Sequence, residues 1–376
     1  MASATIMADN MRLYTSNKMS NNLVACMTQD RHGYIWIGTW YGLNKFDGYR
    51  FTIYTHRNDD KRTLPSNTVP SIYTDRRGVV WVGTSNGLAR YNEREDCFQR
   101  IRLTEFDGQP RVQRFAEDAE GNLFVSTSGF GLFEIKAGKD TAQIVDIFSP
   151  DVNGGYYQNI FIDSRQYLWV LDNNNIITCF DIRRPGSHPL LRHKSEMGIV
   201  EQFIEDGKGN IYIVFQKGIM CYDGHRFRHI DTGGDYVFRC ATRQGDDMLF
   251  GTVGSGVLRM MPDGRFVRLV DDAQSMIANA KVGVIMEDAM HNLWIGCTEK
   301  GLVFMPYKKP LFNERTFAAS GVKSRGVLSS VTKGQNGTFY GTVHNEGLYR
   351  SYGNDVTPIV KLPEINHVYC DTHGNF

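Results

Sequence analysis

The sequence predicts an all-β fold: a seven-bladed β-propeller of four-stranded antiparallel blades, followed by the first part of a second propeller. Two observations predict it. A turn of the form Asp-x-x-Gly recurs at intervals of 37 to 45 residues, and a large apolar side chain stands six residues after each of the first eight turns. The turns begin at Asp30, Asp75, Asp118, Asp163, Asp206, Arg243, Asp288, Lys333 and Asp371, and the large side chains are Trp36, Trp81, Phe124, Trp169, Tyr212, Leu249, Trp294 and Phe339.

Each copy of the repeat reads as four short strands joined by turns. Strand A precedes the Asp-x-x-Gly turn, and strand B follows it and carries the large side chain. In the first copy a Gly-containing turn at 40–42 leads to strand C at 43–46, and a turn at 47–48 leads to strand D at 50–54. Helical periodicity is absent throughout. Because one such unit cannot bury its apolar faces alone, we expect the copies to pack around a ring.

The number of copies sets the expected domains. We expect residues 1–320 to form one closed seven-bladed propeller and residues 321–376 to begin a second one. Residues 11–15 resemble the strand D sequence at 50–54, although no strands A to C precede them. An open ring would leave two unpaired sheet edges, so we expect residues 11–15 to close the ring as an outer strand.

The residue types of the repeated turn have a structural explanation. Gly supplies backbone angles that a side chain would hinder, and Asp accepts hydrogen bonds from its own turn. A calcium loop needs further acidic ligands at fixed spacing, and none follow. The seven cysteines are scattered without a Cys-x-x-Cys pair. We therefore expect no metal ion and no cofactor.

Charge and hydropathy exclude several classes of partner. Lys and Arg number 42 against 41 Asp and Glu, with no block of like charge, so we expect no nucleic-acid binding. No apolar run is long enough to cross a bilayer, so we expect no membrane contact by this fragment. Residues 1–10 lack the apolar region of a signal peptide, so we expect no signal peptide in this chain.

Residues 30–47 and 75–92 both spell Asp-x-x-Gly-x-ψ-Trp-[Ile/Val]-Gly-Thr-x-x-Gly-Leu-x-[Lys/Arg]-[Tyr/Phe]-[Asp/Asn], where ψ is aliphatic. This pattern resembles the two-component regulator propeller repeat. The resemblance implies the periplasmic or extracytoplasmic sensor region of a hybrid two-component protein. It also implies that histidine kinase activity belongs to a longer parent protein, through which a homodimer could form, and that an oligosaccharide is the leading ligand class.

Two other functions fit a propeller of this kind. One is a protein-interaction scaffold of the WD-repeat type, since exposed aromatic turns also serve protein surfaces. The other is a glycosidase or lyase, which needs two carboxylates facing one cavity. Asp172, Glu299 and Glu346 fall in the relevant turns, but nothing in the sequence pairs them. We therefore expect that this chain is not an enzyme.

The ligand is expected on the face where D–A loops and B–C turns meet. Strand A runs from the D–A loop to the Asp-x-x-Gly turn and strand B returns antiparallel, which places these loops and turns together. Aromatic faces stack on sugar rings, and Arg and Asn supply directed hydrogen bonds. The candidate ligand-binding residues are Trp40, Tyr41, Asn86, Arg111, Phe130, Tyr156, Asn174 and Tyr236.

Overall fold

The computed structural model describes residues 11–105, 108–145, 157–184, 188–270, 275–307, 328–335, 338–352 and 355–371. These residues form eight four-stranded antiparallel sheets and contain no α-helix, hence no helix that could span a membrane. The chain divides into two compact units, Met1–Lys309 and Pro310–Phe376. The predicted boundary between residues 320 and 321 lies outside the described residues.

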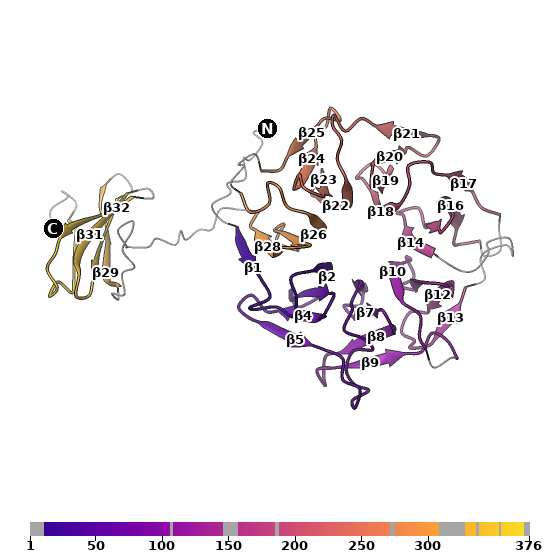
Figure 1. Ribbon diagram of the computed structural model, residues 1–376, viewed down its shortest axis with the longest axis horizontal. Coiled ribbons are helices and arrows are strands. Elements are labelled where there is room, and N and C mark those ends of the chain that lie inside the picture. The colour runs from indigo at the N-terminus through magenta and orange to yellow at the C-terminus, as the bar shows by residue number, and fades with distance from the viewer. Residues whose placement is uncertain are drawn as a thin grey trace. The chain divides into compact units, whose positions relative to one another are not determined.

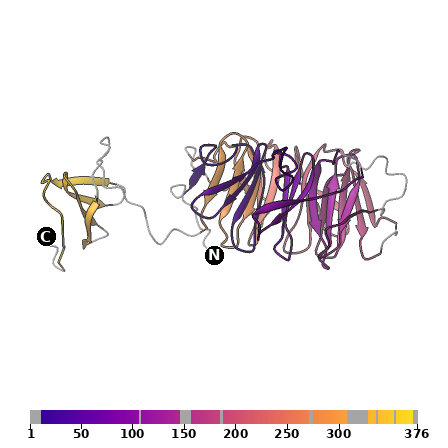
Figure 2. The ribbon, with the colours of Figure 1, turned by 90° about the horizontal axis from the view of Figure 1, so that it is seen from below.

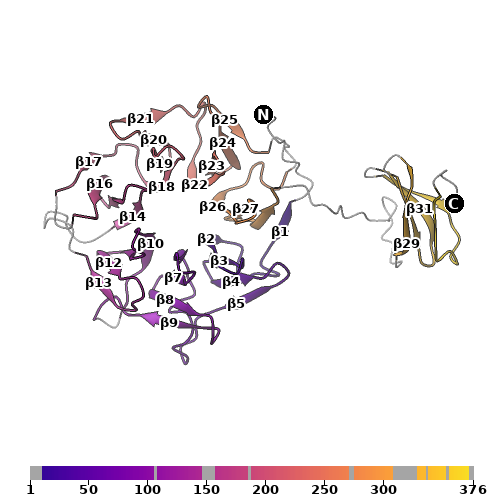
Figure 3. The same ribbon diagram turned by 180° about the vertical axis from the view of Figure 1, so that it is seen from behind.

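Seven of the sheets stand around a common axis in the first unit (Figure 1). Their innermost strands contact one another in order, and the last, β26 (Val282–Glu287), contacts the first, β2 (Val24–Gln29), so the ring is closed. The same ring is seen from behind in Figure 3, and from its edge in Figure 2, where the strands run between two faces. The predicted seven-bladed propeller is confirmed.

The strands of each blade follow one another from the inside to the outside. The first four blades are β2 (Val24–Gln29), β3 (Ile35–Thr39), β4 (Gly42–Phe46) and β5 (Phe51–Tyr54); β6 (Ser71–Thr74), β7 (Val80–Thr84), β8 (Gly87–Asn92) and β9 (Cys97–Ile101); β10 (Val112–Glu117), β11 (Leu123–Thr127), β12 (Leu132–Ile135) and β13 (Ala142–Ile144); and β14 (Tyr157–Ile162), β15 (Tyr167–Asp172), β16 (Ile176–Asp181) and β17 (Leu191–Lys194).

Three more blades complete the ring. They are β18 (Val200–Glu205), β19 (Ile211–Phe215), β20 (Gly218–Tyr222) and β21 (Phe227–Ile230); β22 (Phe238–Gln244), β23 (Asp247–Thr252), β24 (Val257–Met260) and β25 (Phe266–Arg268); and β26 (Val282–Glu287), β27 (Leu293–Cys297), β28 (Gly301–Met305) and, from the start of the chain, β1 (Arg12–Tyr14).

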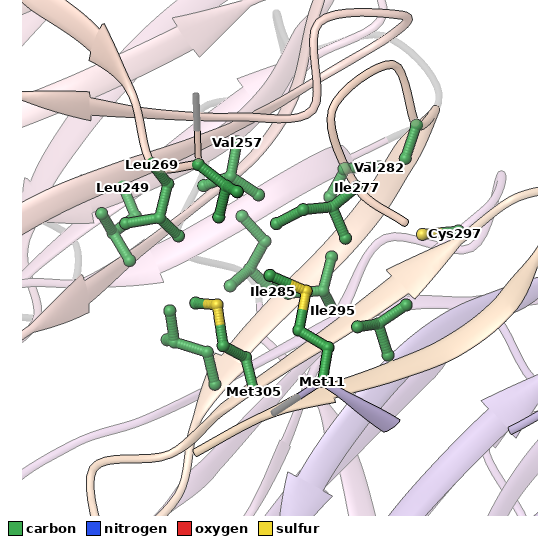
Figure 4. Close-up of a cluster of buried hydrophobic side chains, with 14 of the residues drawn as sticks. Met11, Leu249, Val257, Leu269, Ile277, Val282, Ile285, Ile295, Cys297 and Met305 are labelled. Atoms are coloured by element: carbon green, nitrogen blue, oxygen red, sulfur yellow. The ribbon is translucent and has the colours of Figure 1, made fainter. Parts of the chain in front are cut away.

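The outer strand of the seventh blade comes from the beginning of the chain. β1 pairs antiparallel with β28, with Tyr14 opposite Leu302. Met11, just before β1, is 7% exposed and belongs to the hydrophobic cluster between the sixth and seventh blades. Figure 4 shows its side chain beside Met305, Ile285 and Ile295. The ring is therefore joined by strand pairing and by packing.

The repeated Asp is a hydrogen-bond acceptor that joins the A–B turn to strand B. Asp30 Oδ1 accepts hydrogen bonds from the backbone N–H groups of His32 and Tyr34, and Asp30 Oδ2 accepts one from Trp36 Nε1 at 2.8 Å. Gly33 takes a φ of 85°, which favours glycine. The structural explanation of the turn is confirmed. The same Asp–Trp bond occurs in three other blades, between Asp75 and Trp81, Asp163 and Trp169, and Asp288 and Trp294.

The core consists of seven hydrophobic clusters, one between each pair of neighbouring blades. Trp36 packs with residues of the second blade, and Trp294 of the seventh blade packs with residues of the first. All four repeat tryptophans are at most 4% exposed, as the register of the repeat predicts. Because each blade supplies one wall of two clusters, no blade is stable without its neighbours.

The second unit contains one sheet, formed by β29 (Leu328–Lys333), β30 (Phe339–Val343), β31 (Gly347–Tyr352) and β32 (Asp355–Val360) in the same order as in the blades. Residues 366–370 lie beside β29: the Cys370 N–H donates to Thr332 Oγ1 and the Val368 N–H to Ser330 Oγ, each at 3.3 Å. This is the place of the innermost strand of a following blade. The sheet thus has the organisation predicted for the first part of a second propeller.

Candidate functional site

The D–A loops and the B–C turns lie at the same end of the blades, which we call the loop face. Backbone hydrogen bonds join a loop to a turn within a blade, and the Asp-x-x-Gly turns lie at the opposite end. The bonds run from Trp40 N to Leu23 O at 3.3 Å, from Ser128 N to Arg111 O at 3.0 Å, and from Gln216 N to Ile199 O at 3.1 Å. A ligand on the loop face would therefore contact segments whose backbone is fixed by the blades.

Trp40 and Tyr41 form the B–C turn of the first blade. Their side chains are 53% and 58% exposed. The turn backbone is nevertheless well bonded, because the Tyr41 N–H donates to Thr39 Oγ1 at 3.1 Å and the Trp40 carbonyl accepts from Thr68 Oγ1 of the next D–A loop at 3.4 Å. Two neighbouring aromatic rings are thus presented to solvent on an ordered turn.

Asn86, Arg111 and Phe130 follow in the second and third blades. Exposed Asn86 accepts a hydrogen bond from the Gln109 N–H at 3.3 Å, which joins it to the loop that carries Arg111. Arg111 is half-buried, and Phe130 is 42% exposed in the B–C turn of the same blade. The candidate residues of the first three blades therefore lie on one connected run of loops.

The remaining candidates are less closely grouped. Asn174 is exposed in the turn between β15 and β16, where its N–H donates to Asp172 Oδ1 at 2.8 Å. Tyr236 is half-buried, with its ring 6.1 Å from that of Phe238, and packs against the cluster between the fifth and sixth blades. No hydrogen bond, ion pair or ring contact among the described residues joins Asn174 or Tyr236 to the other candidates. Tyr156 lies outside the described residues.

A β-bulge interrupts the innermost strand of most blades at its loop-face end. In the first blade the pairing with β3 shifts between Val24 and Cys26, so Ala25 is left over. In the second blade Pro70 takes the same place before Ser71, which pairs with Gly83 as Cys26 pairs with Gly38. Bulges re-aim side chains beside functional sites. The bulged residues of the other blades are Gln113, Gln158, Glu201, Arg239 and Gly283.

These bulged positions divide the inner rim of the loop face into two halves. In the third to sixth blades the residues are polar, and we call Gln113, Gln158, Glu201 and Arg239 the polar arc. In the other three blades the residues are Ala25, Pro70 and Gly283, which carry no polar side chain. The backbone of the ring is nearly symmetric, so this difference in side chains distinguishes one half of the loop face from the other.

Hydrogen bonds organise the polar arc. Glu201 Oε1 accepts from Arg239 at 3.0 Å and from Gln216 Nε2 at 2.8 Å. In the third blade Gln113 Nε2 donates to Ser128 Oγ at 2.6 Å, and Gln113 Oε1 accepts from Arg111 Nε at 3.4 Å. Of the candidates predicted from sequence, Arg111 is therefore the one bonded to the polar arc.

Sequence reasoning did not select the polar arc, although a signal for it was present. Apolar residues stand six and three positions before the first residue of the Asp-x-x-Gly turn, as Val24 and Met27 do before Asp30. A regular strand repeats every two residues, so a spacing of three requires one extra residue. That extra residue is the bulge. The spacing alone would have directed attention to Gln113, Glu201 and Arg239.

The three carboxylates considered for catalysis are not brought together. Asp172 is 8% exposed, and its Oδ1 accepts hydrogen bonds from two N–H groups of its own turn. Glu299 forms an ion pair with Lys281 in the seventh blade. Glu346 belongs to the second unit, where it accepts from Tyr349 Oη at 2.8 Å. Within the first unit, Asp172 and Glu299 thus stand in different blades, each with partners of its own.

The family of the repeat is decided by a comparison with models of protein families. Residues 18–41 and 63–86 match the model described as two component regulator propeller. These segments are two-component regulator propeller repeats. Each spans strand A, the Asp-x-x-Gly turn and strand B, which are the parts that hold the Asp–Trp bond. A search among curated protein sequences finds no match.

Solved structures resemble this chain in fold. The extracellular domain of the hybrid two-component system BT3049 from B. thetaiotaomicron matches with a TM-score of 0.69 and 20% identity over 97% of this chain and 51% of that chain. The corresponding domain of BT4673 from the same organism matches with a TM-score of 0.64 and 19% identity over 96% and 50%. This chain therefore spans about half the length of those domains.

An enzyme also has this fold. Virginiamycin B lyase from Staphylococcus aureus, in a catalytically inactive form with quinupristin, matches with a TM-score of 0.61 and 14% identity over 78% of this chain and 98% of that chain. At such low identity the likeness concerns the propeller and not the site. Function has to be argued from the loop face itself.

Proposed function

We propose that this chain is a ligand-sensing propeller from the extracytoplasmic region of a hybrid two-component signalling protein, and that its ligand is an oligosaccharide. The two-component regulator propeller repeats support the first part, as does the likeness to extracellular domains of hybrid two-component systems. Any kinase activity belongs to the parent protein. This chain contributes binding.

The observation that carries the proposal is the pair of exposed rings at Trp40 and Tyr41 on the loop face. Exposed aromatic residues on a fixed turn give up little conformational freedom on binding, and their faces stack on the apolar faces of sugar rings. Polar side chains that can orient hydroxyl groups lie on the same face, at Asn86 and along the polar arc. An aromatic surface beside polar groups is the composition that carbohydrate binding requires.

Calorimetry with a panel of oligosaccharides tests the proposal. We expect Trp40→Ala and Tyr41→Ala to weaken binding of the recognised sugar at least about tenfold, which corresponds to about 1.4 kcal/mol. Tyr49→Ala is the matched control, because Tyr49 is 94% exposed in the turn between β4 and β5, at the end of the blade opposite the loop face. Equal affinities of the Trp40→Ala, Tyr41→Ala and Tyr49→Ala proteins would contradict the proposed site.

The same preparation separates the alternatives. A sensor binds its sugar without cleaving it, so chromatography after prolonged incubation should return the oligosaccharide intact; a cleaved product would indicate a glycosidase or lyase. A protein partner retained through the loop face, in the absence of any sugar that shifts the melting temperature, would indicate a protein-interaction scaffold.

A further inference from the structure

Arg114 directly follows the bulge in the innermost strand of the third blade. Its guanidinium donates to the backbone carbonyl of Gln113 at 2.9 Å. In the part of the chain that the structure describes, neither Arg114 nor Arg111 takes part in an ion pair, whereas Arg239 of the polar arc is paired with Glu201 at 3.0 Å. An unpaired charge away from water is costly, so natural proteins rarely keep one without a use.

Arg114 lies on β10, the innermost strand of the third blade, and its guanidinium and that of Arg111 both donate to Gln113. Burial lowers the pKa of Arg114, and the charge of neighbouring Arg111 lowers it further. Two groups act in the opposite direction, Cys26 of the first blade and Glu201 of the fifth. Residues of the first, third and fifth blades come near one another only around the axis of the ring. These contributions agree with the place of Arg114 on β10, among the innermost strands of the ring.

The charges of this region do not balance. Among the described residues, the carboxylate that acts on Arg114 and pairs with Arg239 is Glu201, which already accepts hydrogen bonds from Arg239 and Gln216. The blades on the other side of the axis supply Ala25, Pro70 and Gly283 at their bulges, none of which has an acceptor side chain. An anion brought by a ligand would find two guanidinium groups outside any ion pair of the described residues, whereas Glu299 on the loop face of the seventh blade is already paired with Lys281.

We propose that Arg111 and Arg114 form a subsite for an anionic group, a carboxylate or a sulfate, carried by the sensed oligosaccharide. This inference rests on the proposed function and narrows it to acidic oligosaccharides. Planar guanidinium groups match carboxylate and sulfate oxygens with pairs of parallel hydrogen bonds. Trp40 and Tyr41 would stack on the sugar ring, and the two arginines would favour an oligosaccharide that carries a negative charge.

Inorganic sulfate tests the subsite without any sugar. Thermal unfolding is followed in sodium sulfate and in sodium chloride of equal ionic strength, for the unchanged protein and for the Arg111→Gln, Arg114→Gln and Arg226→Gln variants. Sulfate stabilises most proteins by exclusion from their surface, a response that does not saturate and that all variants share. We expect an additional, saturable rise in melting temperature that Arg111→Gln and Arg114→Gln abolish.

Two variants make the result decisive. Arg226→Gln is the matched control, because Arg226 lies beside the turn between β20 and β21, away from the loop face, with 81% of its side chain exposed. It should keep the full response. Arg114→Lys keeps a positive charge and should keep part of the sulfate response. A partial response would show that the loss in Arg114→Gln is not caused by misfolding. An identical sulfate response in the unchanged protein and in both glutamine variants would overturn the subsite.

A pair of sugars tests the ligand class. Tetragalacturonate and its fully methyl-esterified form share the same rings and differ in charge. We expect the acid form to bind at least about tenfold more tightly, with the preference removed by Arg114→Gln. Equal affinities for the two forms would leave the oligosaccharide sensor in place and overturn the anionic subsite. A saturable sulfate response without binding of either sugar would support the subsite and count against the oligosaccharide function.

Discussion

The Oδ2 atom of Asp75 accepts a hydrogen bond of 3.0 Å from Nε1 of Trp81, and both side chains are inaccessible to solvent. Asp75 Oδ1 also accepts from the N–H groups of Arg77 and Val79. One carboxylate thus joins the A–B turn of the second blade to the ring that fills the space toward the third blade.

Replacement of either partner should destabilise the propeller. Trp81→Ala should cost about 3–5 kcal/mol through the cavity it leaves. Asp75→Ala should cost about 1–3 kcal/mol for each buried donor left without an acceptor. Urea unfolding measures both. Asp263→Ala is the control, because Asp263 is half exposed and bonds only within its own exposed turn. A fully tolerated Trp81→Ala would contradict the role of this ring in the core.

Gly83 should not tolerate a side chain, for lack of space. A Cβ atom at this position would lie 2.2 Å from Ser71 Oγ and 2.6 Å from Val112 Cγ1 of the next blade. We expect Gly83→Ala to lower the free energy of unfolding by about 1–3 kcal/mol, as overpacking does. Gly108→Ala is the control, because nothing lies within 4 Å of its Cβ position. Equal melting temperatures of the two variants would show that the blades move apart readily.

Arg114 should reduce the stability of the unliganded protein. Arg114 is half-buried and takes part in no ion pair among the described residues, so Arg114→Gln removes a charge that is costly to shield from water. In sulfate-free buffer we expect Arg114→Gln to raise the free energy of unfolding by about 1 kcal/mol. A gain of this size is typical when a residue kept for function is replaced by one that suits the fold better. Urea unfolding measures this, with Arg226→Gln unchanged. A destabilised Arg114→Gln, rescued by Arg114→Lys, would instead identify Arg114 as a structural residue.

Stability should decline at alkaline pH. Burial raises the pKa of Cys179 and of Cys240 from 9.0 to about 12, and that of Tyr212 from 10.0 to about 12. In the unfolded chain these groups ionise near their ordinary values, so ionisation favours the unfolded state between about pH 9 and pH 12. The contribution is fully present below pH 9 and is lost as the pH rises through the folded values.

The urea midpoint measured from pH 7 to pH 11 checks this dependence. It should be nearly constant up to about pH 8 and fall above about pH 9. Cys240→Ala should flatten the fall, whereas Cys97→Ala, a change outside the buried clusters, should not. A midpoint that stays constant to pH 11 would show that the buried thiols and phenols do not ionise differently in the two states.

The fold was predictable because its signal repeats. A single Asp-x-x-Gly turn means little, but Trp36, Trp81, Trp169 and Trp294 stand at one position of a register that eight copies share. The same physics acts at each copy: an Asp that bonds its own turn and a large ring that needs a neighbouring blade. In the sixth copy Arg243 stands in place of the Asp of the turn. The sixth blade could still be predicted, because the apolar positions around Arg243 define its strands.

The loop face was less predictable because its residues do not repeat. Trp40 and Arg111 were found by their place in turns and loops, where polarity and exposure are expected. Arg114 and Glu201 sit inside strands, and only the pairing shift in the innermost strand reveals where their side chains go. The balance of charges around the axis depends on which blades face each other across the ring. It therefore follows from the closed ring and not from any single copy of the repeat.

The pairing of β1 with β28 also orders events during synthesis. Tyr14 precedes its partner Leu302 by almost the whole ring in the sequence, so Leu302 emerges from the ribosome long after Tyr14, when the seventh blade is almost complete. Until then the edge of β1 has no neighbour in its own chain, and ring closure is a late step of high contact order. At high concentration the same edge can pair with β28 of another copy. We therefore expect domain-swapped dimers, joined through β1, as a misassembly of this ring.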